Sequence, residues 1–275
     1  MRNDMAFLVI LFFYFLSTLG YVLYFSIQKD VFRKIGQSAL LIGFIIQTLV
    51  IGVEYFNAGQ FPVQNLHETL AIMAWATAGV FMILGMKINL KILGAFVAPF
   101  VTILMIAALH FPNINAEQGA LFKTIWLPLH IITVFTGEAA FAMAFFIGIL
   151  YLVQENAIKA KKRGYFYKRL PSLELIDHTG YVCIIIGFTT ITAGLITGMI
   201  YAKLVWGRFW GWDPKEVWSG ISWLVYAILL HQRLTVGWRG RNAAVMAIIG
   251  FFILTFTFLG VNLLLGGHHG TFTKW

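Results

Sequence analysis

Residues that suit chemistry are concentrated between Trp206 and Arg241, near the C-terminal end of the chain. Four tryptophans fall within 13 residues there, separated by two glycines: Trp206, Trp210, Trp212 and Trp218. An apolar run follows them and ends at His231. Flat indole faces beside flexible backbone suit a large planar ligand, and imidazole is a common metal ligand. This stretch is therefore predicted to bind a planar ligand, with His231 as a candidate metal ligand.

A structural explanation of the same stretch stays open at this point. Tryptophan is enriched where membrane and water meet, because its ring is apolar and its N–H needs a partner. The stretch also contains a favourable helix start, with Asp213 as the N-cap, Pro214 at the first helical position and Glu216 at the third. Composition alone does not separate an interfacial belt from a ligand platform.

The composition indicates a polytopic membrane protein. The 275 residues are 60% hydrophobic and 11% charged, whereas a soluble domain carries about 25% charged residues. The expected fold is all-α, because the membrane core has no water to satisfy open backbone groups and nothing alternates like a barrel strand. Cys183 is the only cysteine, so no disulfide or metal–thiolate site is expected, and any thiol chemistry must belong to another protein.

Eight apolar runs are long enough to span a membrane, which takes about 20 residues each. The chain is expected to be one integral membrane domain over 1–275, with an outer tryptophan-rich loop at 202–219. The first run is interpreted as a span rather than a cleavable signal peptide. Arg2 and Asp4 precede it, and the long apolar run has no small-residue cleavage site. The predicted spans are Met5–Ile27, Ser38–Phe56, Thr69–Met86, Ile92–Phe111, Ile125–Val153, Ile176–Tyr201, Pro214–Leu234 and Ala243–Leu265.

Basic residues in the loops predict the orientation of these spans. Of the 20 lysines and arginines, 14 fall in the loops on one side and 6 on the other. Cytoplasmic loops are enriched in Lys and Arg, so both termini and the tryptophan-rich loop are expected on the outer, extracytoplasmic side. The net charge of +9 then reflects topology rather than nucleic-acid binding. The basic cluster within 154–174 is expected to anchor the chain and to attract anionic membrane lipid.

The sixth predicted span is rich in glycine, threonine and alanine. Small residues let helices approach closely in lipid, so this span is expected to be a packing helix. Asp177 is expected to cap its cytoplasmic start, and the neighbouring His178 is assigned no ligand role.

Further candidate residues lie toward the outer face that this topology predicts. His130 is near the outer end of the fifth span, and His268 and His269 follow the last span. Haem iron takes two axial ligands and imidazole is a common one, so histidines from two helices can hold the iron while the indoles cover the porphyrin. Glu138 lies about 12 Å deeper than His130 along a helix. An ionisable residue at that depth is a candidate for function.

The stretch WGRFWGWDPKEVWSGISWLVYA resembles the tryptophan-rich "WWD" signature of the haem-handling proteins of cytochrome c biogenesis. Within that superfamily, the chain resembles the CcsA (ResC) proteins of the system II haem-attachment machinery. The motif is long and specific, and the resemblance extends from about Phe61 to the C-terminus.

The resemblance implies a pair of outer haem ligands. In CcsA-like proteins, one histidine before the WWD segment and another after the last span ligate haem outside the membrane. His130, in the context WLPLHI, matches the first of these, and GVNLLLGGHH places the second at His269. Gly270 and Thr271 depart from the serine and tyrosine that usually follow, which leaves His268 as the alternative.

The resemblance also implies a ligand within the membrane. His231 matches the position of the family's intramembrane haem ligand, and the family's second intramembrane ligand comes from a CcsB (ResB) partner subunit. The structural alternative for His231 is an interfacial histidine satisfied by Arg233 or by lipid headgroups. On charge alone, Arg208 and Lys215 are candidates for pairing with the haem propionates, and Asp213 either contacts the ligand or serves only as a cap.

The function implied by the resemblance is haem transport and presentation. Haem b is expected to enter at His231, cross the membrane, and meet the CxxCH segment of an apocytochrome c, whose thiols add to the haem vinyl groups. The expected activity is holocytochrome c synthase (haem lyase), shared with the CcsB-like subunit and served by a thioredoxin-like thiol reductant. No catalytic nucleophile or base is assigned, because the chemistry belongs largely to the cofactor.

Two other functions stay open on the sequence. One is a haem exporter or delivery protein without ligation activity, like the CcmC type of the same superfamily, which is expected to have fewer spans. The other is a structural membrane subunit of a larger complex. The membrane is expected to be a bacterial inner (plasma) membrane, or a thylakoid membrane if the chain is plastid-encoded.

Overall fold

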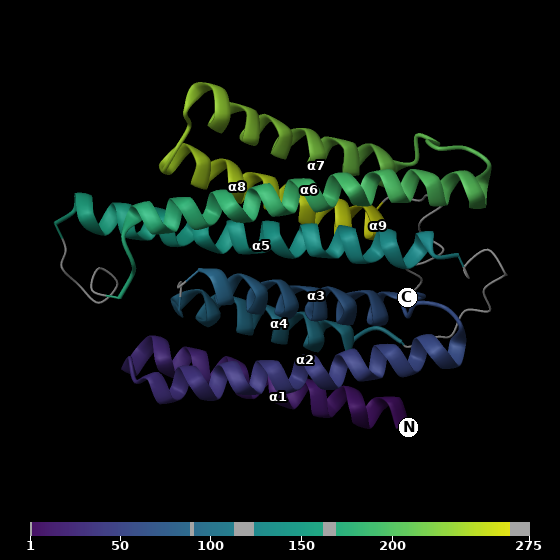
Figure 1. Ribbon diagram of the computed structural model, residues 1–275, viewed down its shortest axis with the longest axis horizontal. Helices are drawn as coiled ribbons and strands as arrows, with labels where there is room; N and C mark the ends of the chain where they lie inside the picture. Colours follow the sequence, from purple (N-terminus) through teal and green to yellow (C-terminus); the bar gives the residue numbers. More distant parts are fainter. Residues whose placement is uncertain (1, 89–90, 113–123, 162–168, 265–275) are drawn as a thin grey trace. The chain divides into compact units, whose positions relative to one another are not determined.

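The chain is helical wherever its structure is described. The computed structural model describes residues 2–88, 91–112, 124–161 and 169–264, and it contains no strand among them. The long helices, labelled in Figure 1, are α1 (Arg2–Ile27), α2 (Asp30–Ala58), α3 (Leu66–Lys87), α4 (Gly94–Ala108), α5 (Trp126–Lys159), α6 (Leu173–Trp206), α7 (Pro214–His231) and α8 (Arg241–Thr255). The short elements are the 3₁₀ turn η1 (Lys91–Leu93), the π-helical segments η3 (Gln232–Val236) and η4 (Phe256–Gly260), and α9 (Val261–Leu264).

Most of these helices have the length and composition of membrane spans. Among the described residues, seven qualify: α1 from Met5, α2, α3, η1 with α4, α5, α6, and α8 with η4. The predicted all-α, polytopic membrane fold is therefore confirmed. The remaining predicted span, α7, forms a helix of 18 residues but is less apolar, because Lys215 and Glu216 lie in its first turn.

Capping residues decide where the helices begin and end. Ser172 caps α6 by accepting a hydrogen bond from the Leu175 N–H at 3.3 Å. The expectation that Asp177 caps this helix is wrong, because a suitable side chain is available five residues earlier and Asp177 lies inside the helix. At the other end, Gly207 stops α6 in the left-handed conformation (φ 73°), which favours glycine. The helix therefore continues beyond Tyr201, where the predicted span ends.

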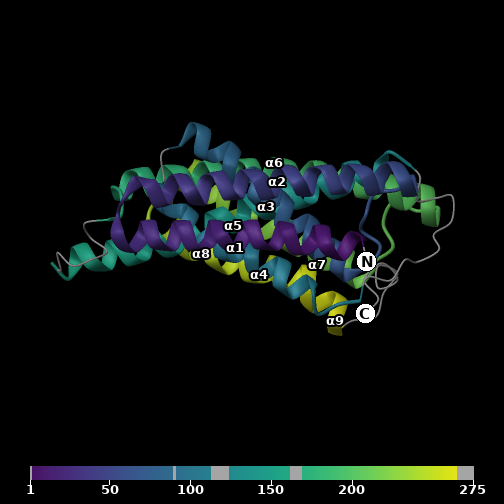
Figure 2. The same ribbon diagram turned by 90° about the horizontal axis from the view of Figure 1, so that it is seen from below.

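The described residues form two compact units, and the first contains α1 to α4, up to Pro128. Its helices α1 and α2 form a hairpin and lie side by side in both views (Figures 1 and 2). Their close approach requires glycine at position 20, where a Cβ atom would lie 2.6 Å from the Gly36 nitrogen. The Tyr14 hydroxyl donates to Gln47 at 2.6 Å, and the Gln47 amide donates to the α3 backbone. Buried polar groups thus tie α1, α2 and α3 together.

The second unit contains α5 to α9, from Leu129 onward. Its core includes a stacked pair of rings, Phe141 of α5 and Tyr226 of α7, with centroids 3.4 Å apart and planes 6° from parallel. Both rings are fully buried. The Phe141 ring fills the space that glycine leaves at Gly187 of α6, where a Cβ atom would lie 2.5 Å from it. One aromatic layer therefore joins α5, α6 and α7, the three helices that hold most of the candidate site residues.

Candidate functional site

The tryptophan-rich stretch is only partly a loop. The connection between α6 and α7 comprises residues 207–213, so Trp206 ends α6 and Trp218 lies in the second turn of α7. Trp206 meets Tyr201 edge to face, with ring centroids 6.4 Å apart. Trp218 packs against Phe256 of η4, with centroids 4.6 Å apart. These two tryptophans therefore take part in helix packing.

The other two tryptophans lie in the connection itself. Trp210 and Trp212 are perpendicular to each other, with ring centroids 6.0 Å apart. Trp212 is 78% exposed, and Phe209 is 53% exposed. Trp212 also has a φ of 59°, in the left-handed region that bulky residues rarely adopt. Such strain concentrates at functional sites, where the surroundings hold it in place. The connection thus presents an exposed aromatic surface at Phe209 and Trp212.

The first turn of α7 holds this connection in place. Asp213 accepts a hydrogen bond from the Lys215 N–H at 3.0 Å, and the Glu216 carboxylate accepts from the Asp213 N–H at 3.2 Å. The helix start predicted from the sequence is therefore confirmed. The same oxygen of Glu216 also accepts from the Gly211 N–H at 2.6 Å. Glu216 consequently fixes the backbone between Trp210 and Trp212, which the capping pattern alone did not predict.

Replacing Glu216 by alanine should lower the free energy of unfolding by about 1–2 kcal/mol, because two backbone N–H groups lose their acceptor. The variant should also be cleaved faster by protease within 207–213. Thermal unfolding in detergent and limited proteolysis measure the two effects. Glu174→Ala is the matched control, since Glu174 is an exposed acidic residue in the first turn of α6. Equal losses in the two variants would contradict the role of Glu216.

The two basic residues considered for haem propionates have different surroundings. Arg208 is exposed, and its guanidinium lies beside Gly211, where a Cβ atom would be 2.8 Å from it. Lys215 is half-buried in the first turn of α7, and Glu138 lies in α5. Glu138 is 6% exposed, and its Oε2 has no hydrogen-bond partner among the described residues. Arg208 is therefore the more exposed of the two basic residues, and it lies next to the exposed Phe209 in the sequence.

His130 is half-buried in the second turn of α5. Its Nδ1 lies 2.8 Å from the carbonyl oxygen of Gly194 in α6. Its ring also lies against Gly198, one turn further along α6. The structure therefore brings α5 and α6 together at His130, whereas sequence reasoning treated α6 as a packing helix alone.

His231 lies at the opposite end of α7 and is exposed. Other exposed residues of this helix precede it at intervals of three or four, so they share its face: Ile221, Leu224 and Ile228. The stripe continues to Leu234 of η3, which is 66% exposed. His231 is thus a polar residue within an otherwise apolar strip on the surface of the second unit.

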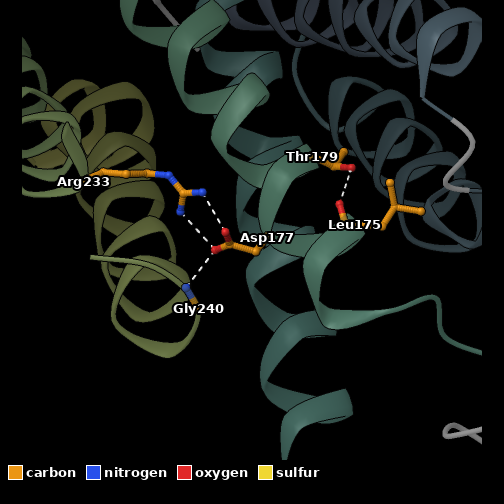
Figure 3. A network of polar contacts seen from close by, with 5 residues as sticks. All are labelled: Leu175, Asp177, Thr179, Arg233 and Gly240. Carbon is orange, nitrogen blue, oxygen red and sulfur yellow. Dashed lines mark hydrogen bonds and ion pairs between the residues drawn. The ribbon is translucent and has the colours of Figure 1, made fainter. Parts of the chain in front are cut away.

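A largely buried ion pair anchors the segment that follows His231. Arg233 donates to both carboxylate oxygens of Asp177 in α6, at 3.0 and 2.6 Å (Figure 3). The Gly240 N–H donates to the same carboxylate at 2.8 Å, and the Arg233 guanidinium lies 4.4 Å from the centre of the Tyr181 ring. Arg233 therefore serves Asp177 rather than His231. Both residues were visible in the sequence, but nothing in their spacing indicated that they pair.

Figure 3 also shows how α6 carries this network. The Thr179 hydroxyl donates to the Leu175 carbonyl at 2.7 Å, one turn back along the helix. That bond keeps the threonine side chain on its own helix, while Asp177 extends toward Arg233 and Gly240. The hairpin between α7 and α8 is thereby held to α6 by charge.

His268 and His269 lie outside the described residues. The helix that precedes them is described to Leu264, and it is joined to the tryptophan-rich stretch. The Thr257 hydroxyl of η4 lies 2.9 Å from the Ser222 hydroxyl of α7 and 3.3 Å from the Trp218 carbonyl oxygen. The last helix is therefore tied to the beginning of α7 by hydrogen bonds as well as by the Trp218–Phe256 ring contact.

Comparison with known proteins gives a consistent family. Residues 63–269 match the family described as "Cytochrome C assembly protein". A "Cytochrome c biogenesis protein CcsA" of Guillardia theta is 32% identical over 97% of this chain and 94% of its own length. The protein of the same name from Synechococcus elongatus is 28% identical over 86% of each chain.

A solved structure has the same fold. The chain resembles "Cytochrome c Heme Lyase CcmF" with a TM-score of 0.63 at 15% identity, over 98% of this chain. It spans 46% of that longer protein. The family match covers most of the sequence, including the tryptophan-rich stretch and both helices that carry His130 and His231. This chain therefore belongs to the cytochrome c assembly protein family and is a membrane protein of cytochrome c biogenesis.

Proposed function

We propose that this chain binds haem b as its substrate, carries it across the membrane and presents it for attachment to an apocytochrome c, as the CcsA-like subunit of a system II synthase. The observation that supports this most is the placement of His130. Its Nδ1 is held by a backbone carbonyl at 2.8 Å, and its ring lies in the same unit as the exposed aromatic surface. An imidazole held by one nitrogen leaves the other for iron.

The groups around the outer end of α7 fit a porphyrin. Phe209 and Trp212 offer exposed ring faces that suit a flat apolar macrocycle. Arg208 is exposed beside them, and a guanidinium pairs well with the carboxylates of haem propionates. We assign His130 as one axial ligand and His269 as the other, with His268 as the alternative. Trp206, Trp210 and Trp218 support this surface from the helices and the connection.

The attachment reaction needs orientation rather than a protein nucleophile. Each thiol of the CxxCH segment adds across a haem vinyl group: the S–H bond and the vinyl π-bond break, and an S–C and a C–H bond form. No electrons are gained or lost in that sum, so no oxidant is consumed. The contribution of this chain is to hold the haem edge still and to exclude side reactions, which lowers the barrier by proximity.

The second site in this proposal is at His231. A lone imidazole in a lipid-facing apolar strip is unfavourable, so a partner is expected to cover it. We assign this face of α7 to the CcsB/ResB-like subunit, with haem held between His231 and a ligand from that partner. In the predicted orientation, His231 lies near the cytoplasmic side and the tryptophan-rich connection lies outside. A thioredoxin-like reductant then keeps the apocytochrome thiols reduced.

Purified wild-type protein, co-expressed with a CcsB-like partner, should show the absorption spectrum of low-spin haem and should support covalent haem attachment to a co-expressed apocytochrome c. His130→Ala and His269→Ala should each weaken the low-spin spectrum, since the haem at His231 remains, and should reduce holocytochrome yield by at least about tenfold, the smallest effect expected of losing an outer-shell group. His178→Ala is the matched control, because His178 is an exposed histidine of the same unit.

The outcomes separate the candidate functions. Bound haem without any thioether product would favour a haem exporter or delivery protein. If haem is absent from all preparations of the protein, the ligand assignments are contradicted and a structural subunit is favoured. Haem binding that is unaffected by His130→Ala would mean that the outer haem site does not use this residue of α5.

A further inference from the structure

The imidazole of His130 is in contact with the backbone of α6 at two successive turns. Its Nδ1 lies 2.8 Å from the Gly194 carbonyl oxygen, and the Thr197 hydroxyl donates to that same oxygen at 3.0 Å. A Cβ atom at Gly198 would lie 2.7 Å from both Nδ1 and Cε1 of the ring. The two glycines are four residues apart, so they lie on one face of the helix. Gly198 leaves the space that the ring occupies, whereas a Cβ atom at Gly194 would meet Val134, so Gly194 contributes its carbonyl oxygen.

The hydrogen bond determines which ring nitrogen carries the proton. A carbonyl oxygen only accepts hydrogen bonds, so Nδ1 must be the donor. In a neutral imidazole the other nitrogen then has a free lone pair. Nε2 of His130 has no hydrogen-bond partner among the described residues. The ring is therefore prepared, in its neutral form, to give Nε2 to a metal.

Because Gly198 has no side chain, the His130 ring can pack against the α6 backbone at this position. A Cβ atom there would overlap ring atoms that include Nδ1, so the ring would have to shift, and its hydrogen bond to the Gly194 carbonyl would shift with it. Gly187, two to three turns away on the same helix, has a similar steric role toward a different ring, that of Phe141, at 2.5 Å. Thus α6 contacts a ring from α5 at both glycines, but only the ring at Gly198, that of His130, is a candidate metal ligand.

We infer that α6 positions His130 for haem: the Gly194 carbonyl fixes the tautomer and the rotation of the ring, and Gly198 provides the space for it. Gly198 is thus a positioning residue that acts through His130, and the Gly194 carbonyl acts with it from the backbone. The inference rests on the proposed function for its meaning, since Nε2 matters only if a metal is bound. The hydrogen bond also makes the imidazole a stronger donor, as carbonyl partners of metal-bound histidines do.

The first test uses haem-free protein and is independent of activity. Histidine labelled with ¹⁵N distinguishes a ring protonated at Nδ1 from one protonated at Nε2 by NMR, and the signals of His130 are identified by their loss in His130→Gln. Wild type should show His130 protonated at Nδ1. Gly198→Ala should lose that signal, whereas Gly187→Ala should keep it, although both substitutions introduce a methyl group of equal size between α5 and α6. A wild-type His130 protonated at Nε2 would overturn the inference without any glycine variant.

The second test measures haem bound to the complex with the partner subunit. Gly198→Ala should weaken haem binding about 10- to 100-fold, the range for losing an outer-shell partner, and should change the haem midpoint potential. Gly187→Ala should leave the potential of the remaining haem unchanged, even if it lowers stability. Equal shifts in both variants would mean that α6 acts on haem only through general packing. If His130 is protonated at Nδ1 but its substitution leaves haem binding intact, the placement of the ring by α6 is supported and the proposed function is contradicted.

Discussion

Replacing Asp177 by alanine should lower the free energy of unfolding by about 3–5 kcal/mol, because it leaves a buried guanidinium without its carboxylate. Only 9% of the Arg233 side chain is exposed, and both of its hydrogen bonds to protein groups in this network go to Asp177, at 3.0 and 2.6 Å. The Gly240 N–H loses its acceptor as well. Loss of circular dichroism in titrations with sodium dodecyl sulfate measures the change.

Two variants show whether burial is the cause. Asp30→Ala removes an exposed ion pair with Arg33 of nearly equal length, 3.0 Å, and should destabilise the chain much less, because solvent screens exposed charges. Asp177→Leu combined with Arg233→Leu should recover most of the loss, since neither charge is then left buried. If Asp177→Ala costs no more than Asp30→Ala, the network does not hold the hairpin between α7 and α8.

Local patterns were enough to predict most of the fold. The start of α7 depends on Asp213, Pro214 and Glu216, which lie within four residues of one another, so the sequence reveals the whole cap. The spans depend on average composition over about 20 residues, so seven of the eight predicted spans match helices of that length and composition among the described residues, and α7 is the exception. The residues at which the helices begin and end were harder to predict. A helix continues through polar residues until a cap ends it, and α6 accordingly reaches Gly207.

The contacts that make the site were not predictable, because they join residues far apart in the sequence. Asp177 and Arg233 are 56 residues apart, and His130 and Gly194 are 64 apart. Glycines spaced by four residues indicate a close helix contact, but they do not say which side chain fills the groove. The four tryptophans are a similar case. Their spacing indicated one ligand platform, but Trp206 and Trp218 pack within and between helices, so only part of the cluster is exposed.

Replacing His231 by leucine should have opposite effects on the stability of the isolated chain and on haem binding by the complex. In the isolated chain the substitution removes a polar group from the apolar strip formed by Ile221, Leu224, Ile228 and Leu234. That should raise the free energy of unfolding by about 1 kcal/mol, the cost of an unsatisfied polar group in an apolar setting. A residue that is unfavourable for the chain alone is typical of a functional position.

In the complex with a CcsB-like partner, the same variant should reduce haem binding within the membrane by at least about tenfold, because the loss of a ligand should cost no less than the loss of an outer-shell group. Haem content per complex and unfolding of the isolated chain are the two measurements. His178→Leu is the matched control, because His178 is exposed on α6 of the same unit but lies off the α7 strip. It should change neither the haem content nor the binding of the partner. Stabilisation of the chain without loss of haem would make His231 a lipid-facing residue only, and loss of both would mean that it supports α7 rather than a ligand.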